Sequence, residues 1–135
     1  MNLLNDLKLN NYAIIASNGY FSFDTGIKPV IYRLNESLDF FKGLIVADKI
    51  IGKASAMLLT LSGVKEVHCV VLSDAGKQIF EKYGISYHYE ELVPYIINRT
   101  GDDMCPMEKT VKDIDDLNEA YNALNEKLSS LKANH

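Results

Sequence analysis

The sequence has few cysteines, no tryptophan and no long apolar run, and these absences exclude several classes of protein. Two cysteines in 135 residues are too few for a disulfide scaffold and are typical of a reducing compartment. Apolar runs such as residues 44–47 are far shorter than the roughly 18 residues that a membrane-spanning helix needs. The N-terminus has no basic segment followed by an apolar stretch, so we expect no signal peptide and a cytoplasmic protein.

The charge balance also excludes an obvious polyanionic partner. Lysine and arginine together number 14 against 18 aspartates and glutamates, which leaves a net charge of −4. Scattered lysines on an acidic chain form no footprint for nucleic acid, so we expect neither nucleic acid nor a membrane as partner. With 47% hydrophobic residues, residues 1–135 are expected to fold as one domain that needs no metal or disulfide for its stability.

Apolar periodicity and turn residues predict the secondary structure. Predicted helices cover residues 2–9, 28–36, 47–62, 74–83 and 115–132, and a further helical turn starts at Pro106. Predicted strands cover residues 12–17, 20–24, 65–72 and 85–90. Asn18-Gly19 joins the first two strands as a hairpin, because both residue types tolerate positive φ. Residues 91–104 combine an apolar piece with a polar loop and indicate no single element.

This order of elements predicts an α/β fold. The helix between strands 65–72 and 85–90 indicates a right-handed βαβ unit with a parallel strand pair. The whole chain is therefore expected to form a three-layer α/β/α sandwich around a mixed sheet of about five strands.

Asp48 and Lys49 are the first candidate site residues. They begin the predicted helix 47–62, where free N–H groups and partial positive charge favour polar ligands. Asp48 either caps this helix or faces a cleft together with Lys49 and orients a ligand there. If burial shifts their pKa values, the two side chains become suited to acid–base chemistry.

Gly52-Lys53 resembles the end of a phosphate-binding P-loop. The match fails because positions 47 and 54 are both alanine, so the leading glycine and the final Ser or Thr are missing. Lys53 is also expected inside a helix rather than at its start, and we therefore predict no P-loop.

A polar loop over residues 98–108 is the second candidate site, because long polar loops in compact domains are often functional. Its candidate residues are Asn98, Arg99, Thr100, Cys105 and Glu108. Cys105 and Glu108 have the spacing of a capping box, which is the structural interpretation. The functional interpretation makes Cys105 a nucleophile or redox-sensitive thiol at a helix start. Arg99 either clamps a phosphate or carboxylate or forms a surface ion pair.

The residues that bind soft metals indicate no metal site by their spacing. Neither the cysteines nor His68, His88 and His135 show the C-x-x-C or H-x-x-x-H pattern of zinc proteins. His68 and Cys69 are neighbours on a strand and point to opposite faces. We therefore expect no metal and no other cofactor.

Two segments carry a family resemblance. The segments GLIVADKIIGKASA at residues 43–56 and YIINRTGDDMCPME at residues 95–108, together with the hairpin, resemble an uncharacterised bacterial family of small proteins with a cytidine-deaminase-like fold. The resemblance implies the same three-layer fold with about five strands. In zinc deaminases, the helix after the first hairpin carries His/Cys-x-Glu and the next strand–helix junction carries Pro-Cys-x-x-Cys.

Neither zinc motif is present at the positions expected for it. The first would fall at residues 47–49, which read Ala-Asp-Lys, and the second at residues 72–75, which read Leu-Ser-Asp-Ala. The resemblance therefore implies a deaminase-like fold that is not a zinc-dependent deaminase.

The predicted function uses a cleft where the N-termini of helices 47–62 and 74–83 converge. Asp48, Lys49, Ser73, Asp74 and the 98–108 loop are expected there, and two helix N-termini favour an anionic, nucleotide-like small molecule. An enzyme without zinc would use Asp48, Lys49 and Cys105 as its reacting groups. The alternatives are a non-catalytic sensory module and an oligomeric interaction protein that uses the C-terminal helix, and we expect a homo-oligomer.

Overall fold

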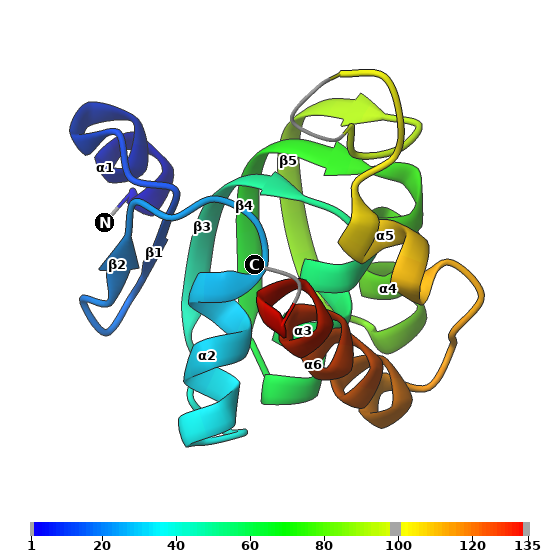
Figure 1. Ribbon diagram of the computed structural model, residues 1–135. Coiled ribbons are helices and arrows are strands. Elements are labelled where there is room, and N and C mark those ends of the chain that lie inside the picture. Colours follow the sequence, from blue (N-terminus) through cyan, green and yellow to red (C-terminus); the bar gives the residue numbers. More distant parts are fainter. Residues whose placement is uncertain (1, 98–100, 134–135) are drawn as a thin grey trace.

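The computed structural model describes residues 2–97 and 101–133, and within these ranges the chain forms six helices and five strands (Figure 1). The helices are α1 (Leu3–Asn10), α2 (Lys28–Glu36), α3 (Lys53–Ser62), α4 (Asp74–Tyr83), α5 (Pro106–Val111) and α6 (Leu117–Ala133). The strands are β1 (Ile14–Ala16), β2 (Phe21–Ser22), β3 (Ile45–Ile51), β4 (Glu66–Ser73) and β5 (Ser86–Val93). Most elements lie close to their predicted bounds.

The strands form one mixed sheet in the order β2-β1-β3-β4-β5. β1 is antiparallel to both β2 and β3, whereas β3, β4 and β5 are parallel. The predicted hairpin is confirmed, although of its two turn residues only Gly19 has positive φ, at 95°. The predicted unit β4-α4-β5 is confirmed, and β3-α3-β4 is a second parallel unit that the apolar pattern did not predict.

The predicted helix over residues 47–62 is wrong in its first half. Residues 45–51 form β3, and α3 begins only at Lys53 after Gly52 in an extended conformation. Asp48 and Lys49 interrupt the apolar residues of β3, so the spacing of those apolar residues resembled the helical pattern of the residues that follow. Lys53 is consequently the first residue of a helix that follows a strand, rather than an interior helix residue.

The two faces of the sheet are covered unequally (Figure 1). α2 to α6 pack on one face over a core that includes Val46, Val67 and Cys69 of the central strands. On the other face α1 alone packs, through Leu3 and Leu7 against Ala47. The expected third layer is thus one short helix, and it leaves part of β4 and β5 open.

The C-terminal helix belongs to the core. Ala120, Leu124 and Leu128 of α6 are buried, and Tyr121 Oη donates a hydrogen bond to Asn35 Oδ1 of α2 at 2.5 Å. The apolar face that we considered for an oligomer interface therefore packs within the chain, and the homo-oligomer itself stays a prediction. Among the described residues, none of the helices has the length and hydropathy to cross a membrane.

Candidate functional site

A small pocket lies where the parallel strands end and the N-termini of α3 and α4 meet. Its volume is about 80 Å³. It is lined by Lys53, Ser73, Ala75, Pro94, Tyr95, Met104, Glu108 and Lys112. The two helix starts therefore do converge, and the loop after β5 together with α5 closes the space. The carboxyl ends of parallel strands are a common place for ligand binding in α/β proteins.

The Glu108 carboxylate occupies the N-terminus of α3. Its Oε1 accepts a hydrogen bond from the Lys53 amide at 2.6 Å, and its Oε2 accepts one from the Ala54 amide at 2.8 Å. Burial raises the pKa of Glu108, and the two amide hydrogen bonds act in the opposite direction. The expected capping box at α5 is wrong, because Glu108 reaches α3 and Cys105 makes no side-chain cap. The Glu108 carboxylate thus occupies the place at the start of α3 where an external anion would otherwise bind.

The contact between Glu108 and the start of α3 requires a glycine at position 52. A Cβ at position 52 would lie 1.9 Å from Glu108 Oε1 and 2.8 Å from Ile96 Cγ1. A Cβ at Gly76 in the first turn of α4 would lie 3.2 Å from the Gly52 carbonyl oxygen. The two glycines therefore allow the two helix starts and the carboxylate to pack closely.

Two lysines bring positive charge to the pocket. Lys53 Nζ donates a hydrogen bond to the Lys112 carbonyl oxygen at 3.0 Å, and Lys112 itself is exposed at the end of α5. Ser73 is buried and caps α4, since its Oγ accepts a hydrogen bond from the Gly76 amide at 3.0 Å. Asp74 begins α4 as an exposed residue and is not part of the pocket lining.

Asp48 and Lys49 do not face a common cleft, which corrects the sequence-based expectation. They are neighbours on β3, so their side chains point to opposite faces of the sheet. Lys49 Nζ donates a hydrogen bond to Asn11 Oδ1 at 2.6 Å, next to α1. Asp48 is buried beside Cys69, its partner in register on β4.

The Asp48 carboxyl is an unusual core group. Desolvation raises its pKa from 3.8 to about 8, although Oδ1 accepts a hydrogen bond from the Ile50 amide at 3.1 Å. A carboxyl in this position is neutral over much of the physiological range, because the interior disfavours its charged form.

The structure describes only some of the candidate residues of the polar loop. Asn98, Arg99 and Thr100 lie outside the described residues. Cys105 is partly buried, packs against the core, and donates its amide hydrogen bond to the Ile96 carbonyl at 2.9 Å. Since Cys105 does not line the pocket, the structure does not bring it together with Ser73 and Glu108.

The two cysteines are expected to differ in alkylation. Burial, with a contribution from the Asp48 charge, raises the pKa of the Cys69 thiol to about 12, so its thiolate is scarce at neutral pH. Iodoacetamide on the native protein should therefore label Cys105, which is partly exposed, and leave Cys69 unmodified by peptide mass spectrometry. In denaturant both should react. Equal labelling in the native state would contradict this arrangement.

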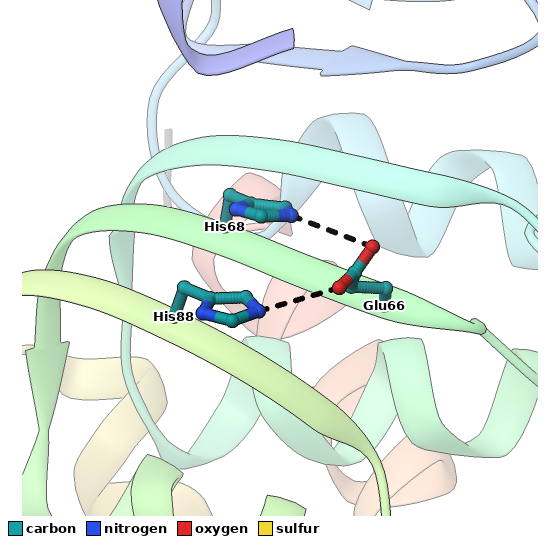
Figure 2. Close-up of side chains that lie close together, drawn as sticks. All are labelled: Glu66, His68 and His88. Carbon is teal, nitrogen blue, oxygen red and sulfur yellow. Dashed lines mark hydrogen bonds and ion pairs between the residues drawn. The ribbon is translucent and has the colours of Figure 1, made fainter. Parts of the chain in front are cut away.

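A second group of polar side chains lies on the open face of the sheet (Figure 2). Glu66 and His68 are two residues apart on β4, and His68 pairs in register with His88 of β5. The ligand atoms of these three residues lie within 4.8 Å of one another. Spacing along the chain did not reveal this cluster. The detectable signals were the i, i+2 pair on one strand and a histidine on the next parallel strand.

The open face also contains the larger of the two pockets described here. Its volume is about 340 Å³, which falls within the range of small-molecule sites. It is lined by Asn2, Leu3, Leu4, Ser17, Ile45, Glu66 and His68. The start of α1 thus forms one wall, and Glu66 and His68 border the pocket as polar groups.

Comparisons with known proteins give a family but no activity. The model of the family TM1506, described as a domain of unknown function (DUF1893), matches residues 2–128. The chain is similar to a DUF1893 family protein (TM1506) from Thermotoga maritima, whose crystal structure was solved at 2.70 Å resolution. The two are 30% identical, the match covers 93% of this chain and 86% of that one, and the TM-score is 0.84. No curated protein matches the chain.

Proposed function

Since the chain belongs to the DUF1893 family of unknown function, we propose from its geometry that it binds a small molecule through a compact anionic group. The proposed site is the pocket between the starts of α3 and α4. The observation that carries the proposal is that one pocket is lined by Lys53, Lys112 and the first turn of α4, while Glu108 already accepts hydrogen bonds from the amides at the start of α3. Lysines and helix N-termini both favour negative charge.

The pocket limits the size of the group that enters it. Its volume of about 80 Å³ is well below the roughly 300 Å³ at which typical small-molecule sites begin. A phosphate or carboxylate group fits this description, whereas the base and ribose of a nucleotide would lie outside. The nucleotide-like ligand expected from the sequence is thus narrowed to its phosphate group. The reducing environment implied by cysteine usage supports a cytoplasmic location as part of the same proposal.

If the pocket catalyses a reaction, Glu108 is the residue that would act as its general acid or base. It is the buried carboxyl in the pocket lining, and its raised pKa favours proton exchange nearer neutral pH. Asp48, Lys49 and Cys105, which the sequence suggested as reacting groups, do not line this pocket. A non-zinc enzyme would therefore depend on Glu108, and a purely binding or sensory domain would not need its proton.

The proposal includes a cytidine-deaminase-like fold without the zinc chemistry. In the observed order, the helix after the first hairpin is α2, and the next strand–helix junction is the one between β3 and α3. The sequence there reads Ile27-Lys28-Pro29 and Gly52-Lys53-Ala54, with no histidine or cysteine at either place. From the sequence, each zinc motif was expected one helix further along the chain than the observed order of elements places it. The positions given by the observed order also lack zinc ligands, which argues against zinc-dependent deamination.

Binding of inorganic phosphate and pyrophosphate tests the proposal. Thermal unfolding of the full chain should shift upward with ligand concentration, because a ligand that binds only the folded state stabilises it. The double variant Lys53→Met, Lys112→Met should lose this shift. The matched control Lys65→Met removes an exposed lysine at the opposite end of β4 and should retain it. Absence of a shift in the unmodified protein would contradict the proposal.

A protein–protein interaction module is the second candidate function. β5 is an edge strand of the described sheet, and it exposes Tyr89 and Leu92 at 40% and 38%. Exposed edge strands readily pair with another chain. Native mass spectrometry of the same samples distinguishes the two candidates, since a homo-oligomer is expected for the module and a monomer contradicts it.

A further inference from the structure

We propose that Glu66, His68 and His88 bind one divalent first-row transition-metal ion, with Zn²⁺ as the reference ion. The site lies on the face of the sheet that α1 leaves open, whereas the anion pocket lies at the carboxyl ends of the strands. The two sites share no residue. Failure of one proposal therefore leaves the other unaffected.

The parallel register of β4 and β5 builds the cluster. Glu66 and His68 lie two residues apart on β4, so they share a face of the sheet, and His88 is the direct partner of His68. The two imidazole rings are stacked, with centroids 4.6 Å apart and planes 14° from parallel. Stacking directs both Nε2 atoms toward the Glu66 carboxylate (Figure 2). Three ligand atoms thus converge from rigid strands rather than from loops.

The distances fit ligands that share an ion. His88 Nε2 lies 3.3 Å from Glu66 Oε1, and His68 Nε2 lies 3.5 Å from Glu66 Oε2. Both exceed the usual 2.7–3.2 Å of an N–H···O hydrogen bond. Two ligands each about 2.0–2.1 Å from a tetrahedral zinc ion are about 3.3 Å apart. The two separations from Glu66 therefore match those of ligands around one ion, whereas the two histidine rings, whose centroids are 4.6 Å apart, would have to tilt toward each other to bind the same ion.

The donor set determines the class of metal. Two imidazole nitrogens and one carboxylate suit zinc, iron, cobalt or nickel, whereas magnesium and calcium prefer oxygen ligands alone. A set of two histidines and one carboxylate occurs in catalytic zinc sites, where a fourth position stays open for water or substrate. Ser86 Oγ is a further polar group near the carboxylate, 3.4 Å from Glu66 Oε1.

The open coordination position would lie beside a ligand-sized pocket. Glu66 and His68 both line the cavity of about 340 Å³ under the start of α1, whose other walls include Leu3, Leu4 and Ile45. Its lining combines these three apolar side chains with Asn2, Ser17 and the two metal ligands. The ligand class that fits is a small, partly apolar molecule with one metal-binding group, such as a carboxylate.

Calorimetric titration of the untagged full chain tests the metal site. After treatment with a chelator, the protein should bind one equivalent of Zn²⁺, and MgCl₂ should give no binding signal. Co²⁺ should produce the visible absorption of a low-coordinate ion. His68→Gln, His88→Gln and Glu66→Gln should each weaken Zn²⁺ binding at least about tenfold, since even residues that only support metal ligands have effects of this size.

Control variants separate this site from incidental binding. His135→Gln removes the third histidine of the chain and should leave Zn²⁺ affinity unchanged. The His88 side chain is 59% exposed, so His88→Gln is expected to fold normally and to give a circular dichroism spectrum like that of the unmodified protein. No Zn²⁺ binding, binding that survives both His68→Gln and His88→Gln, or binding lost in His135→Gln would overturn the proposal.

Discussion

Replacing Asp48 by asparagine is expected to stabilise the protein at alkaline pH and to change its stability little at acidic pH. The pKa of the buried carboxyl is raised from 3.8 to about 8, so the folded state binds this proton more tightly than the unfolded state does. Stability from this group is complete below about pH 4 and is lost as the pH rises to about 8. Asparagine retains an acceptor for the Ile50 amide but never ionises.

The expected difference is large for a single side chain. Between about pH 5 and about pH 9, the unmodified protein should lose roughly 4 kcal/mol of unfolding free energy that Asp48→Asn does not lose. Urea unfolding followed by circular dichroism at both pH values measures it. Asp113→Asn, at an exposed position, should follow the unmodified protein. If Asp48→Asn shows the same pH dependence as the unmodified protein, the buried carboxyl is not the cause.

Gly52→Ala is expected to lower the stability of the protein nearly as much as removal of the Glu108 carboxylate does. Its methyl group would lie 1.9 Å from Glu108 Oε1, so the carboxylate must leave the amides of Lys53 and Ala54. Loss of these two charge-assisted hydrogen bonds in a buried place should cost about 3 kcal/mol. Glu108→Ala should cost a similar amount, because the same amides lose their acceptor.

A double-mutant cycle tests whether the two substitutions act on one contact. The double variant Gly52→Ala, Glu108→Ala should be more stable than the sum of the single effects predicts, by at least about 1 kcal/mol. Unfolding free energies from denaturant titration measure this coupling. Glu126→Ala, at an exposed position of α6, should change stability little. Additive effects of the two substitutions would show that Gly52 is required for another reason.

Elements with strong local signals were predicted close to their observed bounds. α2 begins with Pro29 in its first turn, and α4 lies between the Ser73 cap and Gly84 with positive φ. Each signal acts within a few residues, because a cap or a turn satisfies hydrogen bonds of the neighbouring backbone. β3 was missed because its apolar run has no such signal, and only pairing with β1 and β4 distinguishes it from a helix.

The candidate site could be predicted only in part. The convergence of two helix starts followed from the order of strands and helices, and Ser73 and Glu108 both lie in that pocket. The assignment of Asp48 and Lys49 failed with the helix on which it depended. The contact of Glu108 with α3 joins residues more than 50 positions apart in the chain, so no local pattern indicates it.

The sequence by itself determined that this chain is an α/β protein with few cysteines, a β-hairpin near its N-terminus and helices with identifiable caps. These features arise from local propensity, apolar spacing and composition. Only the tertiary structure decided that Asp48 is buried, that Glu108 fills the start of α3, and that Glu66, His68 and His88 meet on one face. The reason is that burial and strand register arise from contacts between distant segments. A register shift of one residue would turn the strand side chains among them, those of Asp48, Glu66, His68 and His88, to the other face of the sheet.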